Sequence, residues 1–275
     1  MAARKKGTSK KKVRTYRRTQ FVLALIVIAA TIATGYHYRT ALAYYFSFKS
    51  KVAEEDKLHA IRNFQVLSNH QGKSFGFDVS QYQGKINWYQ ADSIEKTFPI
   101  DFVFIRATAG RDKVDNAFHE NWQNAAKVGL IRGAYHYYRP DENSIEQAAL
   151  FISTVTLKKG DLPPVLDIEK IPAEQSIDSL KKGLKRWLTA VEKHYGVKPI
   201  IYSGQKYYED FLRDEFGKDY KFWIANYNFF VENPDEDWLM WQFTEKGKVP
   251  GVLGHADINI FNGSLRELLA VTLRK

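Results

Sequence analysis

The chain has no cysteine among its 275 residues. This absence excludes disulfide bonds, a thiol nucleophile, thiolate-bound zinc and iron–sulfur clusters. Its seven histidines are scattered and show no His-x-x-x-His spacing, so we expect no metal site. No internal repeat or low-complexity segment is present. Hydrophobic residues make up 44% of the chain and charged residues 26%, which is enough apolar material for a packed core.

Acidic residues are missing from residues 1–20, where basic residues are concentrated. The formal net charge of the whole chain is +10. Nine basic residues lie in this short segment: Arg4, Lys5, Lys6, Lys10, Lys11, Lys12, Arg14, Arg17 and Arg18. Residues 21–275 keep 32 basic and 31 acidic residues, a net charge of +1. The excess charge therefore belongs to a basic tail, which we interpret as a membrane-topology signal; no nucleic-acid partner is expected.

A run without formal charge extends from Phe21 to Tyr38, directly after the tail. Its 18 residues nearly cross a hydrocarbon core of about 30 Å, at about 1.5 Å per residue. We predict a transmembrane signal anchor at residues 21–40, held in the lipid bilayer with its N-terminus in the cytoplasm. Four tyrosines would form an aromatic belt at the interface: Tyr36, Tyr38, Tyr44 and Tyr45. The alternative is a signal peptide that is cut after Ala43, which would release a secreted domain.

The remaining sequence divides into a linker at residues 41–72, predicted to be a helical stalk, and a globular domain at residues 73–275. Short apolar runs predict eight strands, at residues 75–79, 102–107, 131–138, 164–169, 199–203, 222–227, 239–243 and 257–260. Amphipathic stretches predict helices at residues 116–128, 144–156, 177–195, 205–216 and 264–273. This alternation favours an α/β fold, a parallel TIM-like (β/α)-barrel. Some helices should be missing, because eight full units need about 250 residues.

Polar side chains mark the ends of nearly all of these strands, where a barrel places its catalytic groups. They are Asp78, Arg106, Tyr137, Tyr138, Asp167, Glu169, Tyr202, Asn226 and Gln242, and Asp257 lies at the last strand. A polar group embedded in an apolar run needs a reason to be there, because burying it is costly. We therefore expect these residues to surround one site.

The segment VLDIE at residues 165–169 carries the clearest chemical signal. Strand residues two apart face the same side, so Asp167 and Glu169 would face the barrel lumen about 6.6 Å apart. Two carboxylates this close have pKa values that split, so that one stays protonated while the other is ionised. Most enzymes that cleave glycosidic bonds use such a pair of carboxyl groups. Asp78 and Asp257 would join the same cluster.

Aromatic residues near the strand ends fit a carbohydrate ligand, because sugar C–H faces pack on Tyr and Trp rings. Seven such residues are Tyr135, Tyr137, Tyr138, Tyr202, Trp223, Tyr227 and Trp241. We expect about a third of them to line a cleft and the rest to lie in the core. Among the seven and the polar set, the expected substrate-binding residues are Tyr137, Tyr138, Tyr202, Trp223, Asn226, Trp241, Gln242 and Arg106. His136 alternates away from its neighbours, so a structural role is expected for it.

The segment FGFDVSQYQGKINW at residues 75–88 resembles the opening motif G-x-D-V-S-x-[WY]-Q-G-x-[IV]-[DN]-W of family 25 glycoside hydrolases, the lysozymes of the Chalaropsis type. Further matches follow in family order: FVFIRAT at 102–108, GAYHY at 133–137, VLDIE at 165–169, PIIYS at 199–203, FWIANY at 222–227, WQFT at 241–244, VPG at 249–251 and DINIFN at 257–262. The resemblance covers residues 74–263 and identifies the domain at 73–275 as a catalytic barrel.

The resemblance implies an irregular barrel that hydrolyses the β-1,4 bond between N-acetylmuramic acid and N-acetylglucosamine in peptidoglycan glycan strands. Glu169 would be the acid, and Asp167 would orient the 2-acetamido group of the substrate for neighbouring-group attack with retention of configuration. Asp78 and Asp257 would tune the pair or hold substrate. The enzyme would need no cofactor and act as a monomer, outside the cytoplasm.

The chain departs from the family pattern at Ala109, because the family commonly reads A-T-E-G where this chain reads A-T-A-G. The missing acid puts one substrate contact in doubt. Two alternatives remain beside the lysozyme interpretation. A chitinase-like barrel would read D-x-x-D-x-D-x-E, but Val165 stands two residues before Asp167, where that motif has an aspartate, and Pro163 stands four residues before it. A catalytically silent, membrane-tethered module would bind peptidoglycan without cleaving it.

Overall fold

The computed structural model describes residues 8–42, 54–233, 235 and 237–274. The chain divides into two compact units, and the boundary between them falls between Val52 and Ala53. The first unit contains helix α1 (Thr8–His37). Within it, Thr19–His37 is long and apolar enough to cross a membrane, with a mean hydropathy of 1.8, as a signal sequence at this place would also be. The predicted cleavage point at Ala43 lies outside the described residues.

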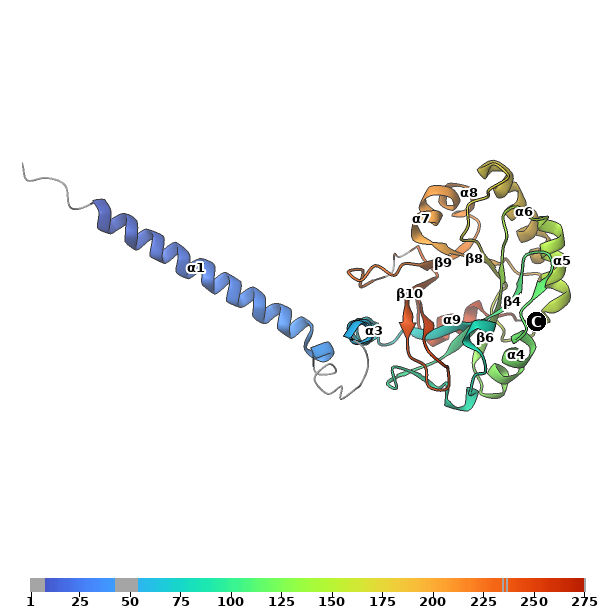
Figure 1. Cartoon of the computed structure of the whole chain (residues 1–275), viewed down its shortest axis with the longest axis horizontal. Helices are drawn as coiled ribbons and strands as arrows, with labels where there is room; N and C mark the ends of the chain where they lie inside the picture. Colours follow the sequence, from blue (N-terminus) through green and yellow to red (C-terminus); the bar gives the residue numbers. More distant parts are fainter. Residues whose placement is uncertain (1–7, 43–53, 234, 236, 275) are drawn as a thin grey trace, which may run out of the picture. The chain divides into compact units, whose positions relative to one another are not determined.

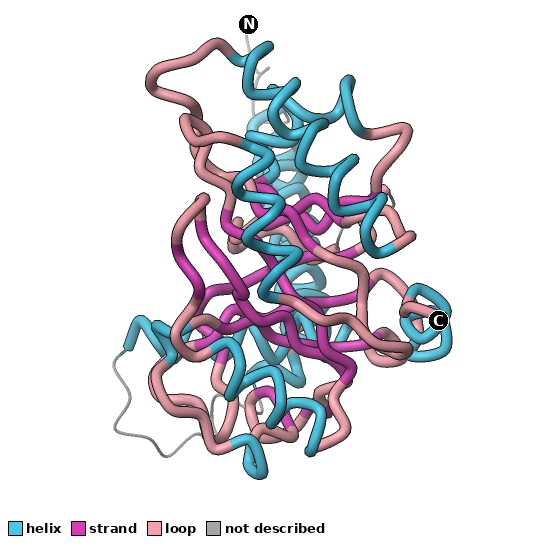
Figure 2. The backbone as a smooth tube through the Cα atoms, turned by 90° about the vertical axis from the view of Figure 1, so that its right-hand side faces the viewer, coloured by secondary structure: helices cyan, strands magenta, loops and turns pink. Residues whose placement is uncertain are grey.

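The second unit is built around a closed barrel of eight strands (Figures 1 and 2). The strands are β1 (Ser74–Val79), β4 (Phe102–Ala109), β6 (Ile131–Tyr137), β7 (Val165–Asp167), β8 (Ile200–Gly204), β9 (Lys221–Ala225), β10 (Met240–Gly247) and β11 (Ala256–Phe261). Neighbours pair in chain order, and β1 closes the barrel by pairing with both β4 and β11. Each strand overlaps its predicted counterpart, although β7 ends at Asp167 and leaves Glu169 just beyond it.

The direction of the last strand differs from the fully parallel barrel that the sequence predicts. Strand β11 runs antiparallel to both β1 and β10, whereas the other pairs in the barrel are parallel. The physical reason is the connection: residues 248–255 form a short loop without a helix, and parallel neighbours need a long crossover. As a result, Asp257 at the start of β11 lies directly opposite Asp78 at the end of β1.

Helices cover the outside of the barrel (Figures 1 and 2). They are α4 (Phe118–Lys127), α5 (Ser144–Thr154), α6 (Ile177–Tyr195), α7 (Gln205–Tyr207) and α8 (Arg213–Phe216). Helix α9 (Leu265–Val271) instead packs its buried Leu268 against residues of the barrel lumen. A π-helical turn at Tyr208–Leu212 joins α7 to α8, where the sequence predicts one continuous helix. Helix α6 is bounded as its sequence predicts, since the Ser176 side chain caps its start and Gly196 ends it in the left-handed conformation.

The core has two layers, because successive strand residues face opposite sides. The lumen is filled by a cluster that includes Phe104, Val165 and Trp223. The space between strands and helices is filled by a larger cluster that includes Ile168 and Trp187. The alternation around β7 therefore places the side chain between Leu166 and Ile168, that of Asp167, on the lumen side.

Helix α3 (Glu54–Asn69) packs on the barrel and is not a free stalk. Its Val66 and Leu67 side chains are fully buried in the outer core. Arg62 donates from Nη1 to the carbonyl of Phe243 at 2.7 Å and from Nε to the carbonyl of Phe229 at 3.1 Å. The compact unit therefore starts near Ala53 and not at residue 73. The earlier part of the predicted linker, residues 43–53, lies outside the described residues.

Two small additions complete the second unit. A short strand β5 (Lys113–Val114) folds back antiparallel on the end of β4. Strands β2 (Ser93–Ile94) and β3 (Phe98–Pro99) form a separate ribbon before β4. The β5 hairpin matters for function, because it builds a wall beside the carboxyl ends of β4 and β6.

Candidate active site

The four predicted carboxylates come together at one end of the barrel. Asp78 and Asp257 are paired residues on neighbouring strands. Asp167 ends β7 on the lumen side, and Glu169 follows two residues later. Each of the four has its pKa raised, and each shift includes the charge of at least one other acid or a bond to it. The structure therefore groups these acids as one electrostatic unit.

Asp78 is held at the bottom of this group by two amide donors. Its Oδ2 accepts from Gln242 Nε2 at 2.7 Å and from Asn259 Nδ2 at 2.8 Å. Burial raises the pKa of Asp78 well above its usual range, and the charge of Asp257 adds to the shift, against the effect of the two donors. Asp78 is consequently fixed in position and costly to ionise.

Gln242 connects this acid to the aromatic wall of the lumen. Its Oε1 accepts hydrogen bonds from Tyr202 Oη, at 2.7 Å, and from Tyr227 Oη. These two donors fix the amide orientation, so that Nε2 must point at Asp78. Trp223 supports the other donor, because its Nε1 donates to Asn259 Oδ1 at 2.8 Å while its ring stacks on Phe104.

Asp167 and Glu169 influence the pKa of one another, and both pKa values are raised. Burial, followed by the charge of Glu169 and a hydrogen bond to it, raises the pKa of Asp167 well above its usual range. Burial raises the pKa of Glu169 less, because the bond from Asp167 and the charge of Lys170 oppose the shift. The Glu169 side chain is exposed, whereas Asp167 is 5% exposed. The more strongly shifted carboxyl, that of Asp167, is therefore the buried one, and that of Glu169 is the more accessible to solvent.

Asp257 titrates near neutrality. Burial raises its pKa to about 7, and the charges of Glu245 and Glu169 contribute, while Lys246 opposes them. No side-chain hydrogen bond of Asp257 is found among the described residues. A change in its protonation state around pH 7 therefore alters the charge of the acidic group.

Arg106 lies on β4, which pairs with β1 on the side away from β11 and Asp257. Its Nε donates to Asp115 Oδ2 at 2.8 Å, and its guanidinium carbon lies 4.7 Å from the centre of the Tyr82 ring. The charge of Arg106 opposes the rise in the pKa of Asp167, so its field reaches the acid pair. Tyr137, at the end of β6, has its pKa raised to about 12 by burial and by Glu169 and Asp167. Both residues line an open cleft beside the acids.

Three aromatic residues that were expected to bind substrate point elsewhere. The buried Tyr138 Oη bonds Ser144 Oγ at 2.8 Å, on the helical side of the strand. Trp241 also faces the outer core, where its Nε1 donates to the carbonyl of Asn226 at 3.0 Å. Trp223 faces the lumen but is 2% exposed, so it supports the site from below and cannot reach a ligand. The alternation along β6 and β10 was available from the sequence and places Tyr138 and Trp241 away from the lumen.

The other expected residues lie at the same end of the barrel. Tyr202 and Gln242 form the buried wall described above, and Asn226 lies half-buried just beyond β9, where its Nδ2 donates to Gln205. Sequence reasoning missed Asn259, the second donor to Asp78, although it stands two residues after Asp257 and so shares its face. Tyr135, whose pKa is raised well above its usual range by burial and then by Asp78, was counted among the aromatics only.

His136 is structural, as expected. It lies between Thr108 Oγ1 at 2.7 Å and Gln147 Oε1 at 3.1 Å and is stacked on Trp187. Burial lowers its pKa to about 4, so it is neutral at pH 7. Within the part of the chain that the structure describes, no three His, Asp or Glu side chains are grouped as metal ligands would be.

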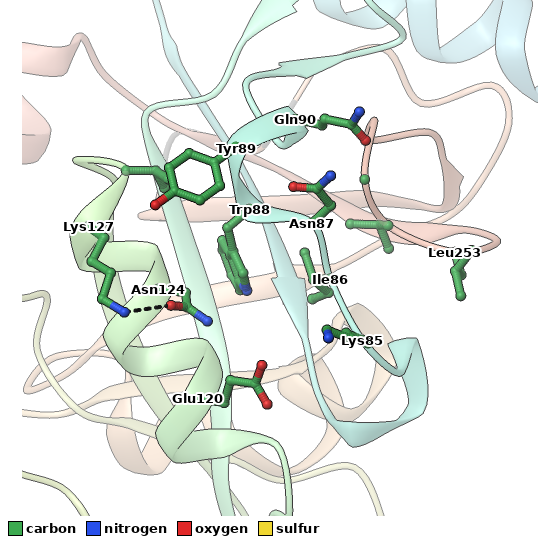
Figure 3. A pocket seen from close by; sticks show the side chains of 13 residues that line it. Lys85, Ile86, Asn87, Trp88, Tyr89, Gln90, Glu120, Asn124, Lys127 and Leu253 are labelled. Carbon is green, nitrogen blue, oxygen red and sulfur yellow. Dashed lines mark hydrogen bonds between the residues drawn. The ribbon is translucent and has the colours of Figure 1, made fainter.

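A second hollow lies away from the acids, between the loop after β1, helix α4 and the β10–β11 loop (Figure 3). Trp88 lies at its base, and exposed Tyr89 and Leu253 stand at its edge. Glu120 is the single carboxylate that lines it, and none of the expected site residues does. The acidic end of the barrel is therefore the better candidate for chemistry.

Known proteins of one family are similar to this chain. The model of the glycosyl hydrolases family 25 matches residues 77–252. Protein YegX of Escherichia coli (strain K12) is 35% identical over 272 residues, which cover 96% of this chain and 95% of YegX. Lysozyme M1 of Streptomyces globisporus is 34% identical over 210 residues, covering 71% of this chain and 70% of the lysozyme.

Solved structures give the same result. The bacterial lysozyme from Streptomyces coelicolor has a TM-score of 0.66 and 30% identity, covering 74% of this chain and 98% of that chain. A family 25 glycosyl hydrolase from Bacillus anthracis has a TM-score of 0.64 and 31% identity, covering 74% of this chain and 95% of that chain. In both, the likeness spans nearly the whole of the known chain.

Proposed function

Because this chain belongs to the glycosyl hydrolases of family 25, we propose that it is a peptidoglycan muramidase that cleaves the β-1,4 bond between N-acetylmuramic acid and N-acetylglucosamine. The observation that carries this proposal is the Asp167–Glu169 pair at the carboxyl end of β7, where both pKa values are raised and each carboxyl affects the other. A glycosidase of this kind needs one carboxyl that gives a proton to the leaving oxygen and another that stays ionised on the sugar side.

Glu169 is the proton donor in this proposal, because it is the exposed member of the pair and can reach a glycosidic oxygen. Asp167 is better placed to receive an N–H group. Its Oδ1 is buried and has no hydrogen-bond partner among the described residues. The acetamido N–H of a bound sugar would donate to this oxygen and so favour the ionised form of Asp167. Asp167 then gives its proton to Glu169, so that substrate binding itself prepares Glu169 as the acid.

The acetamido group oriented by Asp167 is also the proposed nucleophile. Its carbonyl oxygen attacks the anomeric carbon as Glu169 protonates the leaving oxygen, and an oxazolinium ion forms. Glu169, now ionised, removes a proton from the water that opens this ion from the opposite face. Two inversions give net retention. Asp78 and Asp257 would tune the pKa values of Asp167 and Glu169, as their positions in the same acidic group suggest.

We further propose that residues 21–40 anchor the enzyme in the membrane and that the barrel, from about residue 53, acts outside the cytoplasm on wall within its reach. The apolar helix at Thr19–His37 and the basic tail before it support this arrangement. N-terminal sequencing of the chain from the membrane fraction tests it. A mature start at Tyr44 would show that the helix is a cleaved signal peptide.

The hydrolase proposal is tested with purified peptidoglycan and the full chain in mild detergent. Wild type should release muropeptides, and Glu169→Gln should lower the rate by at least about a hundredfold, because general acids contribute about 10²–10⁴. Glu174→Gln, which removes an exposed carboxylate on the same loop, is the matched control and should behave as wild type. If wild type and Glu169→Gln release equally little while both sediment with sacculi, the protein is a silent binding module.

A further inference from the structure

A strongly basic cleft adjoins the acid pair and has no part in the proposed chemistry. It lies between the β5 hairpin and the ends of β4 and β6, and its volume is about 720 Å³. Its charged lining residues are Arg106, Lys113, Arg139, Lys170 and Asp115. Four cations thus face one carboxylate in a hollow that starts beside Glu169. We call it the basic cleft.

The one carboxylate of the basic cleft is already fully engaged. Asp115 Oδ2 accepts from Arg106 Nε at 2.8 Å and from the Gln81 amide at 3.0 Å, and its Oδ1 accepts from the Ala117 amide at 3.0 Å. Asp115 is also 4% exposed, so it cannot neutralise a cation across the cleft. Among the residues that the structure describes, no other carboxylate lines the basic cleft to balance the remaining positive charge.

The cations differ in how far they are paired elsewhere. Arg139 is bound outside the cleft by Glu142 at 3.0 Å and by Asp112 at 3.4 Å. Lys113 and Lys170 are exposed and form no ion pair with any residue in the described ranges. Lys170 lies 6.0 Å from the centre of the Tyr137 ring, at the border between the basic cleft and the acids. The charge of these two lysines is available to a ligand.

The residue across the strands from Lys113 is Ala109, which offers it no charge partner. The two residues are directly opposite on β4 and β5. Side chains at such positions lie about 5 Å apart, close enough for an ion pair across the strands. A glutamate at position 109, which the family commonly has, would face Lys113 and lower the charge of the cleft. Alanine there leaves both the space and the cation free.

We propose that the basic cleft binds a carboxylate carried by the 3-O-lactyl arm of N-acetylmuramic acid, either the free lactyl carboxylate or one on the peptide attached to it. This inference rests on the proposed function, since it concerns the same substrate and the adjoining site. N-acetylglucosamine has a hydroxyl at that position and no anionic arm. The cleft therefore makes the enzyme select muramic acid over a polymer of N-acetylglucosamine alone.

The test changes the charge of the basic cleft without touching the acids. Lys113→Gln removes one cation, and Ala109→Glu adds a carboxylate opposite it. Lys182→Gln on the exposed side of α6 is the matched control. Lys170 is left unchanged, because its charge also acts on the pKa of Glu169. Each full-length variant is measured in detergent against peptidoglycan, peptide-free glycan strands and oligomers of N-acetylglucosamine.

Lys113→Gln should raise KM for the muramic acid substrates about fivefold with kcat unchanged, and Ala109→Glu should raise it more, since one exposed ion pair contributes up to about that factor. The difference should shrink as salt is added. Oligomers of N-acetylglucosamine should be unaffected. An effect on peptide-free strands identifies the lactyl carboxylate as the ligand group, and an effect only on peptidoglycan identifies the peptide.

Equal KM values for Lys113→Gln, Ala109→Glu and wild type on all muramic acid substrates would overturn the proposal, as would an equal change on oligomers of N-acetylglucosamine. Binding of peptide-free strands to Glu169→Gln, with and without Lys113→Gln, separates this result from a failure of the hydrolase proposal. It requires no turnover, so loss of carboxylate-dependent binding there supports the cleft even if wild type hydrolyses nothing.

Discussion

Asp257→Asn should make the barrel more stable at neutral pH. Asp257 faces Asp78 across the β1–β11 pair, and its pKa is raised to about 7 by burial and by neighbouring acids. A carboxyl whose pKa is higher in the folded state than in the unfolded state destabilises the fold once it must ionise. Asparagine has nearly the same shape and removes the charge, and no described side-chain hydrogen bond of Asp257 is lost.

The size of the effect follows from the pKa difference. A rise from 3.8 to about 7 is about three units, and each unit corresponds to about 1.4 kcal/mol, so the ionised group costs at most about 4 kcal/mol. Water penetration and relaxation screen part of this cost, and we expect a stabilisation of about 2 kcal/mol, or about 4–8 °C in Tm. The gain should be absent below about pH 4, grow between pH 4 and 7, and stay constant above.

Tryptophan fluorescence is a suitable assay, because all six tryptophans lie in the barrel unit, between residues 88 and 241. Urea unfolding of the full chain in detergent should be followed from pH 4 to pH 8 for wild type, Asp257→Asn and Asp214→Asn. The last variant removes an exposed aspartate on α8 and should show no pH-dependent gain. If Asp257→Asn is as stable as wild type at pH 8, or is stabilised equally at pH 4, the acids do not repel one another as argued.

Three further substitutions have clear expected outcomes. Asp167→Asn should lower kcat on peptidoglycan by orders of magnitude without loss of stability, because its carboxylate orients the acetamido group; full activity would remove it from the mechanism. Gln242→Leu should lower the free energy of unfolding by about 3 kcal/mol, since three hydrogen bonds are lost and Asp78 keeps one donor, and an unchanged urea midpoint would contradict this. Arg132→Met should cost about 3–5 kcal/mol, because it leaves the nearly buried Asp161, 2.7 Å from Arg132 Nε, without its ion-pair partner; a loss under 1 kcal/mol would contradict that.

The positions of the strands were predictable because each is a short apolar run between turn signals. The direction of β11 could not be predicted from the strand's own residues, since an antiparallel strand and a parallel strand carry the same apolar alternation. The information lay in the short loop between Gly247 and Ala256, which leaves no room for a crossover helix. The antiparallel direction of β11 also explains why Asp257, at the start of that strand, lies beside acids at the ends of other strands.

The acidic part of the site was predictable from local spacing, because Asp167 and Glu169 are neighbours in sequence and strand periodicity fixes their side. The aromatic part was predictable only where strand alternation decides the side, as it does for Tyr138 and Trp241, since the same composition serves both core and cleft. Tyr138 and Trp241 pack against helices, whereas Tyr202 and Tyr227 reach Gln242.

The boundary between the linker and the globular domain could not be predicted from local sequence patterns. Residues 54–69 read as polar and charge-mixed, and the sequence alone predicts a stalk. Two apolar residues, Val66 and Leu67, and one long cation, Arg62, suffice to fix the helix to the barrel. Such docking depends on carbonyl groups of loops far along the chain, which local patterns do not contain.

The identity of the sugar at the new reducing end tests the central claim most directly. Peptidoglycan is digested by the wild-type chain, the products are reduced with borohydride, and mass spectrometry identifies the reduced terminal sugar. A muramidase leaves N-acetylmuramic acid at that end, so we predict its reduced form from wild type and little product from Glu169→Gln. Reduced N-acetylglucosamine at the end would contradict the proposed muramidase activity, and equal product from both proteins would contradict the role of Glu169 as the acid.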